Sequence, residues 1–474
     1  MKLSIKAWKN FRRVFIFLPM MALVYPALAG TPIQLHPENP HYFLFRGEPT
    51  ILITSGEHYG AVLNLDFDAI PYLDELKANG LNLTRTFSGA YCERFGEFNI
   101  EKNTLGPAPL RFVCPWARSA EPGYKNGGNK FNLTKWDEAY FQRLKRFVAE
   151  AGKRGIVVEL VLFCPFYNPE LWTFSPMNAI NNINGFSKVS SMEPYAMKDA
   201  DLLAVQDAMV RKIVEELKIF ENLYYEICNE PYFGGVTKEF QRHIAATIVE
   251  VESAFPGKHL IAQNIANGSG VIDDPDPNVS LFNYHYAYPP DAVGQNYRLN
   301  KAIGYDETGF SGDSDVKYRG DAWAFLLAGG GLFDNLDYSF TTEYENGIAS
   351  QNAPGGGSPA LRLQLKILKD FMYSFDFIRM KPDSSIIAGL EPSKPIRAWA
   401  LAEEGEACAV YLRGGQQADI RLKMAPGAYK AEWVNTVTGK VDKAETIKHA
   451  EGEMKLSSPE YSSDIALRVL RTKK

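Results

Sequence analysis

The 474-residue sequence has few cysteines and lacks the common metal-binding motifs. It contains five Cys but no C-x-x-C or H-E-x-x-H pattern, so metal chemistry has no support in the sequence. The sequence also has no surplus of basic residues, since it contains 51 Lys and Arg and 56 Asp and Glu. Nucleic acids and anionic membranes are bound mainly through Lys and Arg, so neither is expected as the main partner. The composition, 46% hydrophobic and 23% charged, excludes disordered, collagen-like and coiled-coil chains.

The first 29 residues have the features of a signal peptide. Five basic residues precede an apolar run over residues 14–25, and Ala27-Leu28-Ala29 provides a cleavage site. A retained membrane anchor is the alternative, but the run is short for the ~20 residues of a span and Pro19 interrupts it. No Cys follows the cleavage site to carry a lipid. The sequence therefore predicts an exported protein, periplasmic or extracellular in a bacterium, with no membrane anchor after cleavage.

Export would allow the cysteines to oxidise. Cys92 and Cys114 lie in one long loop, where they can pair. Cys164 and Cys228 lie near the ends of predicted strands, where we expect buried free thiols.

From residue 50 to residue 375, short apolar runs alternate with amphipathic stretches, which indicates a parallel sheet with crossover helices. Eight such units predict an α/β fold, a (β/α)8 TIM barrel over residues 30–381. A doubly wound open sheet is the runner-up, but its Gly-rich phosphate-binding turn does not follow the first strand, where residues 55–59 read SGEHY. The predicted strands are 50–55, 81–87, 156–163, 223–228, 260–263, 279–286, 302–305 and 331–333, and the predicted helices are 67–79, 136–154, 201–220, 238–254, 321–327 and 360–375.

The sequence pattern changes after about residue 382. Alternating apolar and polar residues, separated by Gly- and Pro-containing turns, predict short strands in this segment. Residues 382–474 are therefore predicted to form a small C-terminal β-sandwich domain. It can bind glycan, or it can simply cap the barrel.

Two acidic residues follow predicted barrel strands directly. The fourth strand runs into Asn229-Glu230-Pro231, and the seventh runs into Asp306-Glu307. Active sites of such barrels lie at the carboxyl ends of the strands, so the two Glu side chains are expected to meet at one barrel mouth. Paired carboxylates at such a place are what glycoside hydrolysis needs, one to protonate the leaving oxygen and one to attack the sugar.

These segments together resemble glycoside hydrolase clan A. The resemblance covers roughly residues 35–380 and is carried by YYEICNEP (224–231), YDETG (305–309), LTRTF (83–87) and FNYHYAYP (282–289). The cellulase-like enzymes of glycoside hydrolase family 5 and neighbouring families are the most similar. The resemblance implies a retaining glycoside hydrolase that cleaves a plant or microbial oligo- or polysaccharide by double displacement and needs no cofactor or metal.

The resemblance also implies roles for individual residues. Glu230 corresponds to the acid/base, which must hold a proton to act as the acid, and Glu307 corresponds to the nucleophile. Asn229 corresponds to the residue that hydrogen-bonds the sugar 2-hydroxyl, and Arg85 to the residue that keeps the nucleophile ionised. His285 and Tyr286 correspond to the pair on strand six.

The sequence departs from the family pattern at three places. The family has His-x-Tyr on strand six, whereas this chain has His285-Tyr286-Ala287-Tyr288, so either Tyr can take the role. No Trp follows strand eight, where residues 332–338 read LFDNLDY, which argues against cellulose as the substrate. Asp306 is an alternative nucleophile, although the clan favours Glu307.

Other polar and aromatic residues at strand ends and in loops are candidates for substrate contact: His58, Trp172 and Asp334. The long loops 88–133 and 164–200 are predicted to wall a pocket or short cleft, which would suit an exo-acting enzyme without deciding the matter. Transglycosylation by the same two carboxylates is an alternative. A non-catalytic carbohydrate- or matrix-binding protein on a degenerate glycosidase barrel is another, which the intact Glu pair disfavours.

Overall fold

The computed structural model describes residues 30–472, except residues 187 and 351. The predicted signal peptide, residues 1–29, lies outside the described residues. Within the described ranges, no helix is both long enough and apolar enough to cross a membrane.

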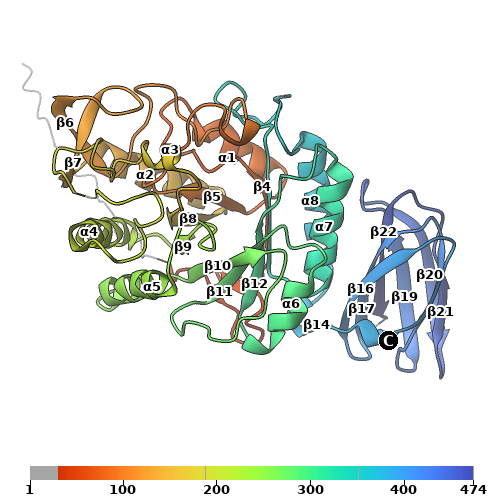
Figure 1. The fold of residues 1–474 in the computed structure, drawn as a ribbon. Coiled ribbons are helices and arrows are strands. Elements are labelled where there is room, and N and C mark those ends of the chain that lie inside the picture. The colour runs from red at the N-terminus through yellow and green to blue at the C-terminus, as the bar shows by residue number, and fades with distance from the viewer. Residues whose placement is uncertain (1–29, 187, 351, 473–474) are drawn as a thin grey trace, which may run out of the picture.

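The larger part of the chain is an eight-stranded parallel barrel surrounded by helices, as the alternating pattern predicts (Figure 1). Its hydrogen-bonded order is β4-β13-β12-β11-β10-β9-β8-β5. The barrel strands are β4 (Leu52–Gly56), β5 (Leu83–Phe87), β8 (Val157–Phe163), β9 (Leu223–Cys228), β10 (Ile261–Asn267), β11 (Leu281–His285), β12 (Ala302–Glu307) and β13 (Leu332–Leu336). The helices are α1 (Ala69–Ala78), α2 (Glu138–Lys153), α3 (Pro169–Trp172), α4 (Ala200–Leu217), α5 (Lys238–Glu252), α6 (Asp291–Asn296), α7 (Asp315–Leu327) and α8 (Pro359–Met372).

The barrel is nearly closed, because β4 and β5, the two ends of the hydrogen-bonded order, lie side by side. Asn82, just before β5, connects them with its side chain. Its amide oxygen accepts a hydrogen bond from the Ile53 amide (2.9 Å), and its amide nitrogen donates one to the Ile51 carbonyl (2.9 Å). One polar side chain thus satisfies backbone groups that a regular ladder would otherwise pair.

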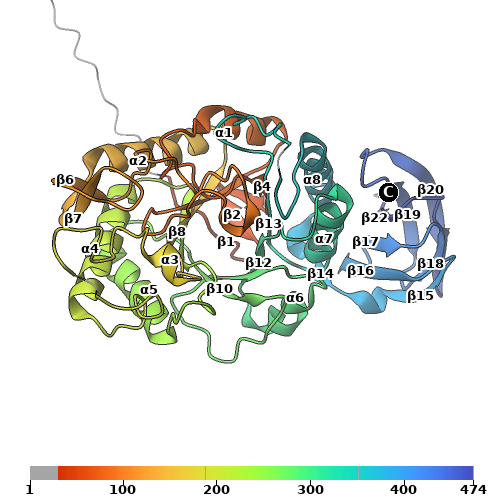
Figure 2. The same cartoon turned by 45° about the horizontal axis from the view of Figure 1, so that its top comes forward.

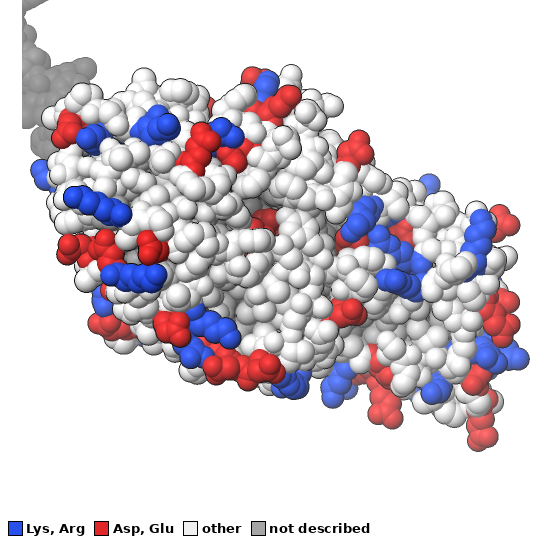
Figure 3. Space-filling model, viewed as in Figure 1, with Lys and Arg blue, Asp and Glu red and all other residues white. Residues whose placement is uncertain are grey.

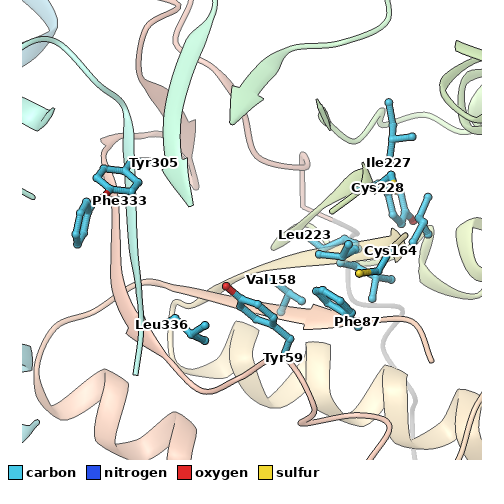
Figure 4. Close-up of a cluster of buried hydrophobic side chains, with 14 of the residues drawn as sticks. Tyr59, Phe87, Val158, Cys164, Leu223, Ile227, Cys228, Tyr305, Phe333 and Leu336 are labelled. Atoms are coloured by element: carbon cyan, nitrogen blue, oxygen red, sulfur yellow. The ribbon is translucent and has the colours of Figure 1, made fainter. Parts of the chain in front are cut away.

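Local sequence explains the regular elements. All seven residues of β8 (VVELVLF) are buried, as expected for a strand covered on both faces. The helix α2 begins after Asp137, whose carboxylate accepts hydrogen bonds from the amides of Ala139 and Tyr140 (2.9 and 3.1 Å). Figure 4 shows a cluster of buried hydrophobic side chains, among which Tyr59 stacks on Phe87 with ring centroids 5.1 Å apart.

The structure departs locally from eight regular strand–helix units and from the predicted elements. No helix is predicted between the fifth and sixth strands, and residues 268–280 after β10 form a loop, so the fifth unit is incomplete. The helix α7 begins at Asp315, six residues before the predicted start, because its first turns are polar and contain Gly320. The long loop after β5 contains a hairpin of β6 (Trp116–Pro122) and β7 (Asn129–Trp136), whose polar, Pro-containing first strand lacks the alternation of a typical strand.

A small N-terminal sheet covers the end of the barrel opposite the strand ends that carry the catalytic candidates. It consists of β1 (Gln34–Leu35), β2 (Phe43–Phe45) and β3 (Glu48–Thr50). Ile33, Phe43 and Phe45 pack against the first residues of the barrel strands, including Leu52 and Leu83, in one buried cluster. Among the residues that the structure describes, this sheet leaves the carboxyl ends of the strands as the end of the barrel that a ligand can enter.

The C-terminal part contains two antiparallel sheets, as predicted (Figure 2). The six-stranded sheet has the order β14-β16-β17-β22-β19-β20, and the three-stranded sheet has the order β15-β18-β21. Their apolar faces enclose a separate buried cluster that includes Val410, Ile420 and Trp433. The boundary between residues 381 and 382 stays a prediction. The strands are β14 (Lys381–Pro382), β15 (Ile387–Pro392), β16 (Ile396–Glu403), β17 (Ala407–Gly414), β18 (Ala418–Leu422), β19 (Gly427–Val434), β20 (Val441–His449), β21 (Met454–Ser457) and β22 (Asp464–Arg471).

The C-terminal sheets pack on the barrel through α7 (Figure 1). The Trp323 ring stacks on Tyr411 at 5.5 Å, and Tyr411 stacks on Trp399 at 5.9 Å. Beside this stack, the Arg319 guanidinium forms a buried ion pair with Asp464 of β22, with Nη2 2.5 Å from Oδ1. The interface between the barrel and the C-terminal sheets therefore combines stacked aromatic rings with a buried ion pair.

All five cysteines are free and buried. For Cys164 and Cys228 this confirms the prediction. For Cys92 and Cys114 the suggested pairing is wrong in this structure. The thiol of Cys92 lies 3.8 Å from the Tyr124 hydroxyl, and the Cys114 thiol donates to the Trp116 carbonyl at 3.7 Å, so the two side chains have different partners.

Candidate active site

The structure brings Glu230 and Glu307 together at the barrel mouth. Glu230 lies two residues beyond the end of β9, and Glu307 is the last residue of β12. A carboxylate oxygen of Glu230 and one of Glu307 lie within 4.8 Å of each other. Both side chains line one cavity of about 300 Å³. Figure 3 shows acidic atoms inside a hollow in the middle of the barrel face, while most charged side chains are scattered over the surface.

Glu307 is held by four surrounding side chains. Tyr286 donates a hydrogen bond to Oε1 (2.8 Å), and Tyr59 donates one to Oε2 (2.8 Å). Arg85 Nη1 lies 3.4 Å from Oε2, and His285 Nδ1 lies 3.4 Å from Oε1. Burial alone would raise the pKa of Glu307, but the positive charges of His285 and Arg85 and the Tyr286 hydrogen bond lower it well below its ordinary value. Glu307 is therefore ionised, as a nucleophile must be.

Glu230 has a different set of partners. Tyr167 donates a hydrogen bond to Oε2 (2.6 Å), and Tyr232 donates one to Oε1 (3.1 Å). His285 Nδ1 lies 3.2 Å from Oε1, so the imidazole stands between the two carboxylates. Burial would lower the pKa of His285, but the charges of Glu307 and Asp306 raise it well above the ordinary value. His285 is therefore the cation that both carboxylates face.

Arg85 connects Glu307 with Asn229. Its Nη2 donates hydrogen bonds to Oδ1 of Asn229 (2.8 Å) and to Oε1 of Glu226 (2.6 Å). The Asn229 amide nitrogen donates to the Tyr167 hydroxyl (2.9 Å). These bonds fix which face of the Asn229 amide points to the cavity, and they join the neighbours of both carboxylates into one network.

A second group of carboxyls lies beneath the cavity, inside the barrel. Glu226, Glu159 and Asp306 are fully buried and cluster around Arg85. Burial raises the pKa of Asp306 well above its ordinary value, since Arg85 and His285 offset the burial only in part. Asp306 also does not line the cavity. Both observations favour Glu307 over Asp306 as the nucleophile.

Three residues of the site have a left-handed backbone, which is unusual for residues with a Cβ. The φ angles are +59° for Tyr59, +36° for Glu230 and +50° for Tyr286. Such conformations cost about 1–3 kcal/mol each and persist where the surroundings enforce them. All three follow the ends of barrel strands, and the unusual turns aim their side chains into the mouth.

Tyr286, rather than Tyr288, contacts Glu307. Tyr288 lies against the C-terminal part, with Arg413 Cζ 4.1 Å from its ring centroid. This places the second aromatic of the His285-Tyr286-Ala287-Tyr288 segment outside the site.

The three other predicted substrate contacts, His58, Trp172 and Asp334, differ in whether they line the cavity. His58 lines the cavity. Trp172 does not line it, because its indole N–H donates to the Val189 carbonyl (3.0 Å) and its ring packs on Phe166. Asp334 is also outside the lining, buried below the mouth, where it accepts a hydrogen bond from the Gly56 amide (3.3 Å). A substrate in the cavity would therefore meet His58 but not Trp172 or Asp334.

Sequence reasoning missed the role of several polar groups. Tyr59, Tyr167 and Tyr232 are recognisable from the sequence only as aromatic rings for sugar stacking, yet their hydroxyls hydrogen-bond the two carboxylates. Glu93, a third carboxyl that lines the cavity, lies in the long loop after β5 and has no motif around it.

Glu230, His285 and Glu307 are also spaced closely enough to hold a metal ion. The neighbouring carboxylates raise the pKa of His285, and a protonated imidazole, which has two N–H donors and no free lone pair, would have to lose its proton before binding a metal. The same proton suits a site that holds two carboxyl groups close together.

No protein-family model and no curated protein matches this sequence. Solved structures do match. A chain described as a glycoside hydrolase aligns with a TM-score of 0.64 and 16% identity, covering 94% of this chain and 98% of that chain. A glycoside hydrolase family 5 protein from Bacteroides vulgatus ATCC 8482 aligns with a TM-score of 0.62 and 15% identity, covering 93% of each chain. At these identities the likeness establishes a fold shared with glycoside hydrolases.

Proposed function

We propose that the protein is a retaining glycoside hydrolase that acts on a plant or microbial oligo- or polysaccharide. The observation that carries the proposal is the short separation of Glu230 and Glu307, whose nearest oxygens lie within 4.8 Å. Retaining enzymes hold their carboxyl groups about 5–5.5 Å apart, whereas inverting enzymes leave about 6.5–9.5 Å for a water molecule. The shared fold and the ionised state of Glu307 support the same conclusion.

The first step forms a glycosyl-enzyme. Glu307 attacks the anomeric carbon while Glu230 gives its proton to the leaving oxygen, so the C–O bond of the substrate breaks as the Glu307–carbon bond forms. Tyr59, Tyr286 and Arg85 hold the nucleophile in place during this step. In the second step Glu230 takes a proton from water, which attacks the anomeric carbon and releases Glu307.

In the proposed mechanism, Asn229 binds the sugar beside the nucleophile. Its amide lines the cavity and is oriented by Arg85 and Tyr167. A hydrogen bond from it to the 2-hydroxyl would strengthen as positive charge develops on the ring. We also propose that the protein acts outside the cytoplasm, on the evidence of its N-terminal sequence.

The test compares wild type, Glu307→Gln and the exposed-loop control Glu101→Gln on a panel of aryl glycosides and plant oligosaccharides, with products separated by chromatography. The proposal predicts product release by wild type and the control, and a loss of roughly three orders of magnitude or more for Glu307→Gln. Equal release by Glu307→Gln would contradict it. If wild type releases nothing but binds glycans on an array, the carbohydrate-binding alternative replaces it.

A further inference from the structure

A buried carboxyl group that neither catalytic step uses lies beside the turn that carries Tyr59. Glu57 directly follows β4 and is fully buried. Within the part of the chain that the structure describes, no ion pair holds this carboxyl group, and burial raises its pKa to about 7 although hydrogen bonds from Thr104, Ala61 and Gly60 oppose the shift. A carboxyl group in such surroundings depends on its hydrogen bonds, and those of Glu57 all go to one turn and one loop.

Both oxygens of Glu57 accept hydrogen bonds from the chain that follows it. Oε1 accepts one from the Ala61 amide (3.0 Å), and Oε2 accepts one from the Gly60 amide (3.0 Å). The backbone closes the same turn, because the Tyr59 amide donates to the Glu57 carbonyl (2.8 Å). Tyr59 lies inside this turn with a φ angle of +59°, which a residue with a Cβ adopts only where its surroundings enforce it. The Glu57 side chain is the group that closes the turn around Tyr59.

Glu57 also connects this turn with the long loop after β5. The Thr104 hydroxyl donates a hydrogen bond to Oε2 of Glu57 and accepts one from the Gly60 amide (3.2 Å). Gly60 approaches the loop so closely that a Cβ at this position would lie 2.1 Å from the Thr104 carbonyl carbon. Leu105, next to Thr104, lines the cavity that holds the two carboxylates. One contact therefore joins a wall of the cavity to the turn that carries Tyr59.

The turn determines where the Tyr59 side chain points. Its hydroxyl donates a 2.8 Å hydrogen bond to Oε2 of Glu307, and Cζ of Arg85 lies 4.6 Å from the centroid of its ring. The Tyr59 carbonyl accepts a hydrogen bond from the Phe87 amide (3.0 Å), which ties the turn to β5. A tyrosine held at its backbone on both sides contacts the carboxylate without having to reorganise during the reaction.

We propose that Glu57 is a positioning residue, which acts through Tyr59 on the reactivity of Glu307. Glu57 does not line the cavity, so it acts on a substrate only through the turn. The inference rests on the proposed function, because it takes Glu307 as the nucleophile. Thr104 is the partner of Glu57 in the long loop, so the position of this loop and the hydrogen bonding of the nucleophile are coupled.

The first experiment is a double-mutant cycle on kcat/KM with Glu57→Gln and Tyr59→Phe. Whichever way the Gln amide turns, its NH₂ group meets a backbone N–H, that of Gly60 or that of Ala61, so the turn loses an acceptor. Each single variant is expected to lose about 10–100-fold, because Glu307 loses a hydrogen bond to its charged form. The double variant is expected to lose no more than about threefold beyond Tyr59→Phe. Losses that multiply would show that Glu57 does not act through Tyr59 and would overturn the proposal.

Two sets of control variants separate positioning from a general loss of structure. Thr104→Val removes the hydroxyl and is expected to lose about three- to tenfold in kcat/KM, whereas Thr104→Ser keeps the hydroxyl and is expected to stay within about twofold of wild type. Glu252→Gln alters another buried carboxyl, which accepts a hydrogen bond from the His259 amide (3.0 Å), and is expected to lower stability without changing kcat/KM. Equal losses for the two Thr104 variants, or for Glu57→Gln and Glu252→Gln, would indicate a general structural effect and contradict the proposal.

Crystal structures of the variants separate this inference from the proposed function. In Glu57→Gln, the proposal predicts that the Tyr59 hydroxyl loses its 2.8 Å bond to Oε2 of Glu307, while Tyr286 keeps its bond to Oε1. This result needs no substrate, so it can be obtained even if wild type hydrolyses nothing and the proposed function fails. If Glu57→Gln does not fold, Thr104→Val gives the same measurement. A Tyr59 hydroxyl that stays on Glu307 would overturn the inference whatever the activity.

Discussion

The hydroxyl of Tyr286 donates a 2.8 Å hydrogen bond to Oε1 of Glu307, and so fixes one oxygen of the proposed nucleophile. The other oxygen of Glu307, Oε2, accepts hydrogen bonds from Tyr59 and Arg85. The bond helps to hold the pKa of Glu307 below its ordinary value. Because ionised Glu307 is the reactive form in the proposed mechanism, activity is expected to fall as the pH drops through that pKa.

Tyr286→Phe is expected to raise the pKa of Glu307 and move the acid limb of the kcat/KM profile to higher pH. A hydrogen bond to a charged group contributes about 1.5–3 kcal/mol, so the loss in kcat/KM is expected to be roughly 10–100-fold. The measurement is a pH–rate profile of the variant against wild type. Tyr344→Phe, at an exposed position away from the cavity, is the matched control and is expected to leave the profile unchanged. An unmoved acid limb in Tyr286→Phe would show that this bond does not tune the nucleophile.

The C-terminal part is expected to stabilise the hydrogen bond between Tyr286 and Glu307 indirectly, through Tyr288. Tyr288 follows Tyr286 closely, and its ring packs against Arg413 of β17 and Trp399 of β16. Arg413→Ala should loosen this loop and move the acid limb in the same direction as Tyr286→Phe, with a smaller loss in kcat/KM. If Arg413→Ala lowers stability but leaves the profile unmoved, the C-terminal part acts only as a cap.

Glu230→Gln is expected to make the rate depend on the leaving group. General acid catalysis contributes roughly 10²–10⁴-fold, and a good leaving group such as dinitrophenolate needs no proton. The variant should therefore lose little kcat/KM on dinitrophenyl glycosides and much on methyl glycosides or oligosaccharides. A uniform loss over a series of leaving groups would remove Glu230 as the acid.

The buried ion pair between Arg319 and Asp464 is expected to stabilise the interface between the two parts of the chain. Asp464→Asn leaves the Arg319 charge buried without its partner, which costs about 3–5 kcal/mol. Burial would raise the pKa of Asp464, but the Arg319 hydrogen bonds and charge lower it. The stabilisation is therefore complete above the unfolded-state pKa of about 3.9 and is lost as the pH falls through the lower folded-state value.

Denaturant unfolding at pH 7 and at pH 3 tests this prediction. The difference between wild type and Asp464→Asn should be large at pH 7 and smaller at pH 3. The control is Glu453→Gln, whose exposed carboxylate lies 3.5 Å from Arg421, and it should change stability by less than about 1 kcal/mol. A difference that does not change with pH would mean that the charge of Asp464 is not what stabilises the interface.

The sequence was sufficient to predict the barrel and the two carboxylates at its mouth. Strands such as β8 and β9 are buried on both faces, so each can be recognised as an apolar run in the sequence without knowing which elements pack against it. Glu230 and Glu307 directly follow such runs, and a parallel barrel brings all strand ends to one side. The likeness to solved glycoside hydrolases agrees with the predicted barrel.

The groups that surround the carboxylates could not be predicted in the same way. Tyr167 and Glu93 lie in long loops whose paths depend on tertiary packing, and no periodicity marks them. Trp172 was predicted to contact the substrate because it is an aromatic residue in a long loop. In the structure its indole N–H instead donates a hydrogen bond to the Val189 carbonyl. Whether the side chain of a loop residue points into a site or away from it is set by tertiary packing, and no sequence periodicity indicates it.

The proposed nucleophile can be identified directly by trapping it. The enzyme would be incubated with an activated 2-deoxy-2-fluoro glycoside of the sugar that it releases, digested, and sequenced by tandem mass spectrometry. The fluorine slows the second step, so the account predicts one added glycosyl group on Glu307. An adduct on the adjacent Asp306, or product of inverted configuration without any adduct, would contradict it.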